Sequence, residues 1–243
     1  MSHFYRFPPR LLGSIGISWL VLRKRNFQED AQVALGSLLP QPIIYGRENI
    51  PSGTCLVTFN HYHRPGFSIH WLVMAIASAL PIMPSARLNL IMTGEWTFQG
   101  QWFGAIGRLL SRLVFKRLAH IYGFTNMPPM PPRKQDVAAR AWAVRKVLSS
   151  LDQATRSFLL LAPEGRDHPH TGLAVPPAGV GRFMALIAEK GLCILPAAGS
   201  EQDGALVVRF GPAYQLDLPR KLARDELDQF VSSLVMERIA NLL

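Results

Sequence analysis

The sequence predicts an α/β fold with a mainly parallel mixed sheet flanked by helices, and an amphipathic helical extension at the N-terminus. Short apolar runs typical of buried strands alternate with longer segments whose apolar residues recur at helical spacing. The chain has 243 residues and is 49% hydrophobic, which is enough for a sizeable core. We expect a helical membrane-interface segment over residues 1–40 and one α/β domain over residues 41–243.

The N-terminal segment contains an apolar run over residues 11–22 with cations on both sides. A helix of this length spans roughly 18 Å, whereas the hydrocarbon core of a bilayer is about 30 Å thick. The run ends in Arg23, Lys24 and Arg25, and no small-residue cleavage pattern of a signal peptide follows it. Two interpretations fit: a helix that lies in a membrane interface, or a helix packed against the domain.

The next segments predict the first strands and a buried helix. Residues 43–46 are typical of a strand, and the turn residues 51–53 separate them from a second apolar run over residues 54–59. Residues 68–80 are mostly apolar and stop at Pro81, so we expect a buried helix there.

Residues 102–120 show the clearest helical pattern in the chain. Their apolar residues recur at helical spacing, and Arg108, Arg112 and Lys116 lie four residues apart on another stripe. A basic amphipathic helix of this kind is typical of a membrane surface. An ordinary surface helix with its apolar face on the core has the same pattern, so both interpretations stay open at this point. The apolar residues over 69–80 and 102–118 could also line a groove for an acyl chain.

The second half of the chain continues the alternation of helices and strands. The proline-rich stretch over residues 127–133 predicts a rigid connection. The helical patterns predict three further helices, the second of which ends at a glycine suited to a C-cap: 136–151, 179–190 and 219–242. The remaining apolar runs predict three further strands: 157–161, 193–196 and 206–210.

The formal net charge of +10 comes from residues 1–150, whereas residues 151–243 carry slightly more acidic than basic side chains. A basic half indicates a polyanionic partner, such as nucleic acid, anionic lipid or a phosphorylated substrate. The cations are interleaved with long apolar stretches and no nucleic-acid-binding motif occurs, so we expect no nucleic-acid partner. No cysteine–histidine spacing fits a zinc site, and we expect no metal.

Two polar motifs follow strand-like runs about 100 residues apart. Asn60 and His61 come directly after the run over residues 54–59, and Pro163, Glu164 and Gly165 follow the run over residues 157–161. Polar side chains at the ends of buried strands are where α/β folds usually place an active site.

These two motifs resemble those of the glycerophosphate/lysophospholipid acyltransferase family, which carries an Asn-His-x4-Asp block and a Pro-Glu-Gly-Thr-Arg block. Asn60 and His61 match the first block. Pro163, Glu164 and Gly165 match the second, and Arg166 follows one position early because the threonine is missing. The resemblance covers about residues 40–243 and implies a glycerol-3-phosphate acyltransferase-like fold.

Weaker similarities support the same assignment. Residues 45–51 are similar to the family's lead-in before the first block, and residues 93–96, which include Glu95, are similar to its Lys-x-Glu-Leu step. Residues 194–198 and 210–212 are similar to two later blocks. The arginine that the family has after its middle strand is absent near residues 125–126, and Arg133 is the candidate that replaces it.

The resemblance implies transfer of a fatty acyl group from acyl-CoA or acyl carrier protein to a glycerophospholipid-type or other lipid hydroxyl. His61 is the expected general base, because the unperturbed pKa of histidine lies near neutrality. Glu164 is the second expected catalytic residue, and Asn60, Pro163, Gly165 and Arg166 are expected to bind substrate. We expect no cofactor beyond the thioester co-substrate, and an anionic membrane surface as partner at the cytoplasmic face.

The first motif departs from the family at one position. Gly66 stands where the family has the aspartate that orients the histidine, and glycine has no side chain. Three accounts follow: another carboxylate, Glu164 or Asp167, takes the role; or the enzyme runs slowly with an unassisted histidine; or the domain binds lipid or acyl carrier without turnover.

Overall fold

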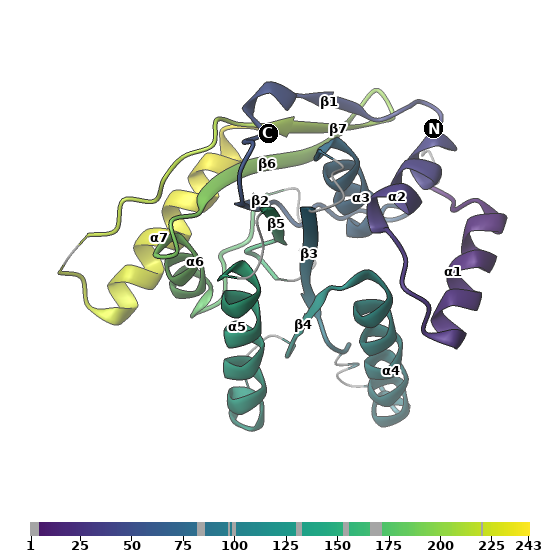
Figure 1. Ribbon diagram of the computed structural model, residues 1–243, viewed down its shortest axis with the longest axis horizontal. Coiled ribbons are helices and arrows are strands. Elements are labelled where there is room, and N and C mark those ends of the chain that lie inside the picture. Colours follow the sequence, from purple (N-terminus) through teal and green to yellow (C-terminus); the bar gives the residue numbers. More distant parts are fainter. Residues whose placement is uncertain are drawn as a thin grey trace.

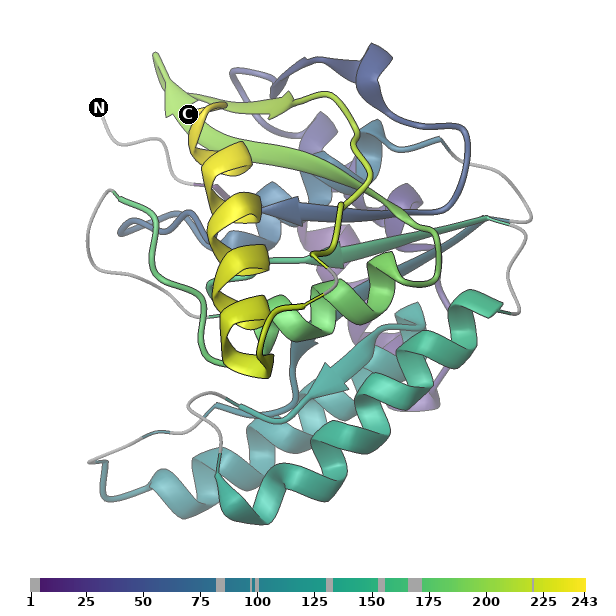
Figure 2. The same ribbon diagram turned by 90° about the vertical axis from the view of Figure 1, so that its left-hand side faces the viewer.

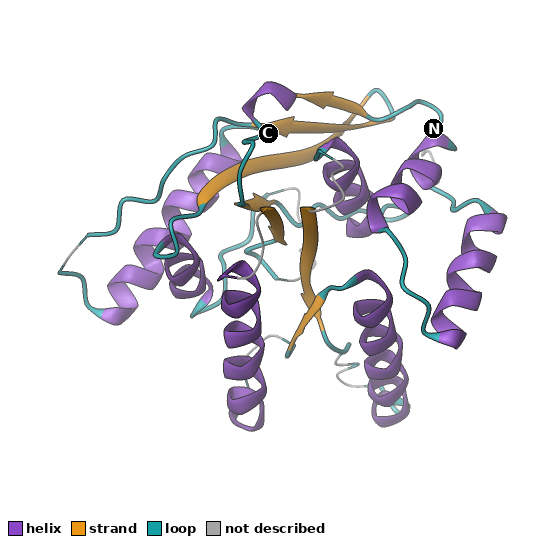
Figure 3. Cartoon of the chain, viewed as in Figure 1, coloured by secondary structure: helices purple, strands orange, loops and turns teal. Residues whose placement is uncertain are grey.

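The computed structural model confirms the α/β fold with a mainly parallel sheet (Figures 1 and 3). It describes residues 5–81, 86–96, 98, 101–129, 133–152, 156–165, 172–219 and 221–243. Seven strands of this described part form one sheet in the order β1-β7-β6-β2-β5-β3-β4. Strands β6 and β7 pair antiparallel, and every other neighbouring pair is parallel.

The elements follow the predicted alternation, with three additions that the sequence patterns did not indicate. The strands are β1 Ile43–Tyr45, β2 Cys55–Phe59, β3 Ala86–Thr93, β4 Thr125–Met127, β5 Arg156–Leu161, β6 Cys193–Gln202 and β7 Ala205–Phe210. The helices are α1 Pro9–Val21, α2 Phe27–Gly36, α3 Ile69–Ala79, α4 Gly104–Tyr122, α5 Val137–Asp152, α6 Val180–Ala188 and α7 Arg224–Ala240. The additions are α2, β3 and β4, and β6 extends six residues beyond its predicted end at Pro196.

The helices cover both faces of the sheet (Figures 1 and 2). Helices α2 and α3 pack on one face, and α5, α6 and α7 pack on the other. Strand β2 supplies both cores, because alternate side chains of a strand point to opposite faces: Cys55 and Val57 lie in one core and Leu56 in the other. A parallel sheet with both faces covered explains why its strands are continuously apolar in sequence.

The N-terminal segment consists of two helices with different surroundings. Helix α2 begins where the Asn26 side chain accepts the backbone N–H of Gln28 at 2.9 Å, a standard N-cap. Ala31, Ala34 and Leu35 of α2 are buried in the core beside α3, whereas most of α1 is exposed. The predicted domain boundary at residue 40 stays a prediction, and the structure shows that α2 contributes to the core.

Helices α3 and α4 both carry apolar residues at helical spacing, but these residues are mostly buried in α3 and mostly exposed in α4. Residues 71–77 of α3 are buried. In α4 the buried positions include Gly104 and Ser111, whereas the apolar stripe lies on the opposite side of the helix and is exposed. This stripe, the α4 stripe, consists of Ile106, Leu109, Leu110 and Leu113. The interpretation of 102–120 as an ordinary surface helix with its apolar face on the core is therefore wrong.

Candidate active site

The candidate site lies where three neighbouring parallel strands end. Strand β2 lies between β5 and β6, so the residues that follow β2 and β5 and the last residues of β6 meet at one edge of the sheet. The segment over residues 60–67, here called the motif loop, leaves this edge directly after β2. This is the position at which open α/β sheets bind their ligands.

Glu164 joins the two predicted motifs. It is 1% exposed, and its Oε1 accepts the backbone N–H of His61 at 2.9 Å. Its Oε2 accepts the backbone N–H of Ala174, also at 2.9 Å. The two N–H groups give each oxygen of the buried carboxyl group a hydrogen-bond partner, which compensates its burial. Pro163 is buried beside it, and Gly165 completes the turn with a φ of 65° and a hydrogen bond from its N–H to the carbonyl of Ala162.

Asn60 fixes the start of the motif loop to β6. Its side-chain nitrogen donates to the carbonyl of Gly199 at 2.9 Å, and its side-chain oxygen accepts the N–H of Gly199 at 2.7 Å. Asn60 is 4% exposed, and both polar atoms of its amide bond to the backbone of Gly199, so we assign it a structural contact. Gly199 is required on the partner strand, because a Cβ there would lie 2.3 Å from Leu72 Cδ1.

Glu201, two residues beyond Gly199 on β6, fixes the middle of the motif loop. Its carboxylate accepts hydrogen bonds from the Tyr5 hydroxyl at 2.9 Å, from the Tyr62 hydroxyl at 3.1 Å, and from two nitrogens of Arg64. Burial raises the pKa of Glu201, but the hydrogen bonds from Arg64, Tyr5 and Tyr62 outweigh it and hold the pKa below the ordinary 4.5. The carboxylate is therefore ionised at neutral pH.

Sequence reasoning did not find Glu201. The apolar run of β6 was expected to end at Pro196, which put Glu201 in a connection instead of at the edge of the sheet. A signal was present in the sequence: Glu201 is the first charged residue after an unbroken run of small and apolar residues over 191–200.

Gly66 adopts a conformation that explains its identity. It has a φ of 84°, in the left-handed region that glycine enters without strain. The N–H of Phe67 donates to the carbonyl of Arg64 at 2.9 Å and closes a tight turn around it. The motif loop thus reverses direction at the position where the family carries its aspartate.

The structure brings together five of the predicted site residues: Asn60, His61, Pro163, Glu164 and Gly165. His61 is half-buried, and its Nδ1 atom is buried. The contact of Glu164 with His61 is made to the main chain, a geometry that positions the histidine. Arg166 and Asp167 lie outside the described residues. The chemical roles given to these residues in the sequence analysis stay predictions.

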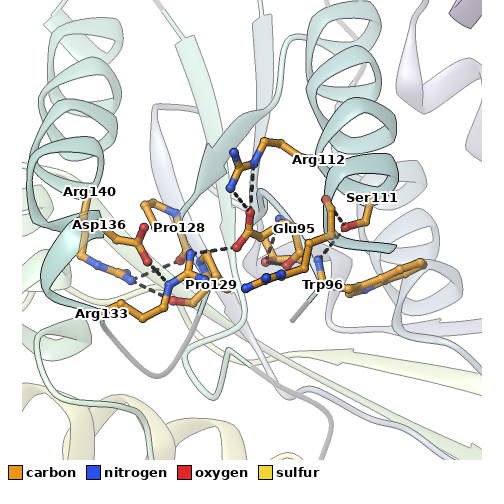
Figure 4. Close-up of polar contacts among 11 residues, drawn as sticks. Glu95, Trp96, Ser111, Arg112, Pro128, Pro129, Arg133, Asp136 and Arg140 are labelled. Carbon is orange, nitrogen blue, oxygen red and sulfur yellow. Dashed lines mark hydrogen bonds and ion pairs between the residues drawn. The ribbon is translucent and has the colours of Figure 1, made fainter. Parts of the chain in front are cut away.

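A second buried carboxylate lies at the same edge of the sheet, beyond β5 (Figure 4). Glu95 follows β3, is 4% exposed, and accepts hydrogen bonds from Arg112 Nε of α4 at 2.9 Å and from Arg133 NH2 at 2.8 Å. Arg133 Nε also pairs with Asp136 at 2.5 Å. The guanidinium of Arg133, the candidate substitute for the missing family arginine, is thus held by two carboxylates, and the substitution itself stays a prediction.

Comparison with known proteins finds similarity in structure but not in sequence. The sequence matches no family model and no curated protein. The structure is similar to the crystal structure of the 1-acyl-sn-glycerophosphate (LPA) acyltransferase PlsC from Thermotoga maritima, with a TM-score of 0.52 and 14% sequence identity. The similarity covers 89% of this chain and 78% of the other. The chain therefore has the fold of this acyltransferase, which is the fold that the motif resemblance implied.

Proposed function

We propose that this protein is an O-acyltransferase that moves a fatty acyl group from a thioester to the hydroxyl of a lipid acceptor. The hydrogen bond from His61 N to Glu164 Oε1 carries the proposal. It unites two motifs about 100 residues apart at the edge of a sheet where α/β enzymes bind substrate. The similarity in fold to a lysophosphatidate acyltransferase supports the same reaction.

His61 is the proposed general base. Because its Nδ1 is buried, we assign proton transfer to Nε2. The imidazole takes the proton from the acceptor hydroxyl as the oxygen attacks the thioester carbonyl. The new C–O bond forms, the C–S bond breaks, and the proton passes to the departing thiolate. This role needs a histidine held in place, and the contacts of Asn60 and Glu164, which fix the main chain at His61, support it.

The co-substrates follow from this chemistry. The donor is an acyl thioester of coenzyme A or acyl carrier protein, and the acceptor is a glycerophospholipid-type or other lipid alcohol. No further cofactor is part of the proposed reaction. Pro163, Gly165 and Arg166 remain the proposed acceptor-binding residues after β5.

One observation favours a second function. Gly66 has no side chain to stabilise an imidazolium, and the loss of an orienting aspartate in a serine protease triad costs about 10⁴-fold in kcat. A module of the same fold that binds lipid or acyl carrier without turnover is therefore the second candidate.

An acyl-transfer assay separates the two candidates. Purified protein is incubated with acyl-CoA and acyl-carrier donors against glycerol phosphate, lysophosphatidate and simple lipid alcohols, and the acylated product is detected by mass spectrometry. The acyltransferase predicts product with at least one pair of substrates and its loss in His61→Ala. Binding of donor or acceptor without product in the whole panel would instead support the binding module.

We also propose that the protein docks on an anionic membrane at the cytoplasmic face through α4 and α1. The α4 stripe is exposed, with Leu109 at 67%, and the cations Arg108 and Lys116 lie beside it on the same helix. Exposed leucines and isoleucines with flanking cations suit the interface of anionic lipids. Among the described residues, no helix is long and apolar enough to cross a bilayer.

Helix α1 extends this surface. Its buried positions are Leu11 and Ser18, and Ile17 and Leu20 are exposed on the other side. The two helices contact each other where Trp19 Nε1 donates to the carbonyl of Val114 at 3.4 Å and Arg117 covers the Trp19 ring at 4.5 Å.

Sedimentation with vesicles tests the docking surface. Leu109→Asp places a charge in the α4 stripe and should release protein from phosphatidylglycerol-containing vesicles. Val137→Asp on α5 is the matched control, because Val137 is similarly exposed at 66% but lies outside the predicted membrane-interface segment and on another helix than the α4 stripe. Equal binding of the two variants would exclude the α4 stripe as the docking surface, and equal binding to neutral vesicles would exclude the role of charge.

A further inference from the structure

Three groups of contacts fix the motif loop, and each of them includes residues from outside the loop. At its start, Asn60 is held by Gly199, and the N–H of His61 is held by Glu164. In its middle, Tyr62 and Arg64 are held by Glu201. His61 therefore lies between two residues that are both anchored to β6.

The end of the loop is fixed by aromatic packing. Phe67 is 1% exposed and contacts the rings of Tyr5 and Tyr62 edge-on, with centroid distances of 4.9 Å and 5.1 Å. The Tyr5 ring also contacts Trp71 at 5.5 Å. Since Tyr5 donates to Glu201 as well, this single carboxylate connects the N-terminal segment, the motif loop and β6.

We propose that Glu201 is a positioning residue for His61 and performs from β6 the orienting task that the family gives to the aspartate of its motif. This inference rests on the proposed function. In the family the aspartate lies within the loop and acts on the imidazole. Here the corresponding position is the left-handed Gly66, and the loop is instead fixed on both sides of His61 by its neighbours. Glu201 accepts hydrogen bonds from two tyrosines and one arginine. If the loop moved away, the carboxylate would lose these donors while staying partly shielded from water, which is unfavourable. We therefore expect Glu201 to hold the loop in one conformation.

The role of Glu201 follows from what it contacts. Its carboxylate bonds to Tyr5, Tyr62 and Arg64, and it acts on His61 through the main chain of the loop. Removing it should therefore lower kcat and leave the KM for the thioester unchanged, because the base is misplaced while the donor still binds. A displacement of about 1 Å can cost on the order of 10²-fold in rate.

The test uses Glu201→Gln and Tyr62→Phe, with Glu189→Gln as matched control, because Glu189 is an exposed carboxylate on a distant helix end. We expect kcat to fall about 10²-fold in Glu201→Gln, less in Tyr62→Phe, and not in Glu189→Gln. Glu201→Asp, which keeps the charge, should restore part of the loss. Unchanged kcat in Glu201→Gln with a folded protein would overturn the inference.

A second readout does not depend on turnover. The imidazole signals of His61 are assigned by NMR from the spectrum of His61→Ala, and their line shapes are compared in wild type and Glu201→Gln. A fixed loop predicts one sharp signal in wild type and broadened or multiple signals in the variant. Identical signals in both proteins would overturn the role of Glu201 even if no substrate were turned over, whereas absence of turnover alone would contradict only the proposed function.

Discussion

Two regions at the same edge of the sheet each contain a carboxylate held by arginine, and they differ in what the carboxylates fix. Around β2, Glu164 and Glu201 hold the backbone and side chains of the motif loop, which carries His61. Beyond β5, Glu95 holds Arg112 of α4 and Arg133 after β4. The first region positions a candidate base. The second fastens the basic helix α4, whose apolar stripe is exposed, to the end of the sheet.

The two regions therefore have different expected roles: the region around β2 serves the acyl-transfer step, and the region around Glu95 attaches α4 to the sheet. Substitutions around β2 should change acyl transfer, and substitutions around Glu95 should change stability and the placement of α4 while leaving the chemical step intact. Four experiments test this assignment of roles, and the substitution with the strongest predicted consequence comes first.

Replacing Glu164 should have the largest effect of these substitutions, on activity and on stability together. In Glu164→Gln one oxygen becomes an NH2 group that faces a backbone N–H, either that of His61 or that of Ala174. A buried donor without an acceptor costs about 1–3 kcal/mol, and the displaced His61 should lower kcat on the order of 10²-fold. Denaturant unfolding and steady-state kinetics measure the two effects. A fully active, fully stable variant would remove Glu164 as the link between the motifs.

Replacing Glu95 should affect stability alone. Glu95→Gln weakens the hydrogen bonds from Arg112 and Arg133 and should cost about 1–3 kcal/mol in the free energy of unfolding; the Arg112 side chain is 64% exposed, which places the cost at the low end. Turnover with a water-soluble acceptor should stay at the wild-type level. A loss of kcat as large as that of Glu164→Gln would show that the two regions are not separable.

Both regions should also contribute to a loss of folding stability at acid pH. Burial raises the pKa of Glu95, but hydrogen bonds from Arg112 and Arg133 outweigh it, so its pKa lies below 4.5, as does that of Glu201. A carboxyl group with a depressed folded-state pKa stabilises the protein above its unfolded pKa, and this contribution is lost as pH falls through the folded pKa. Wild type should therefore lose stability below pH 4.5 more steeply than Glu95→Gln or Glu201→Gln. Parallel stability curves for all three proteins would contradict these assignments.

Restoring the family residue should have the smallest effect. Gly66→Asp places a side chain at a φ of 84°, which costs about 1 kcal/mol for a residue other than glycine. Because Glu201 already fixes the loop, we expect no large gain in kcat. Gly66→Ala is the matched control for backbone strain without a carboxylate. A gain well above that control would show that the scaffold lacks only the aspartate and that Glu201 does not replace it.

The sequence predicted the parts of the fold that depend on local pattern. Both motif blocks were placed after strands, and most helices were found because their apolar residues recur at fixed spacing. Helix α2 was missed because two of its three buried core residues, Ala31 and Ala34, are small and give a weak periodic signal beside Leu35. Strand β4 was missed because three residues are too few for a pattern.

The contacts of the site depend on partners far apart in the sequence, and local pattern cannot supply them. Glu201 lies 137 residues from Arg64 and 196 from Tyr5. The α4 stripe gives a further example: its periodicity predicted an amphipathic helix correctly, but which face meets the core depends on the packing of Gly104 and Ser111. Arg133 was named from the sequence only as a candidate substitute for the missing family arginine, and its pairing with Glu95 and Asp136 emerged only from the structure.

The most direct test of the account compares the turnover of wild type and His61→Ala with the best donor and acceptor pair, alongside their thermal unfolding. The account predicts that the variant loses at least about 10²-fold in kcat, the usual contribution of a general base, while its unfolding temperature stays that of wild type. Equal turnover in the two proteins would contradict the central claim that His61, held by Asn60, Glu164 and Glu201, is the base for acyl transfer.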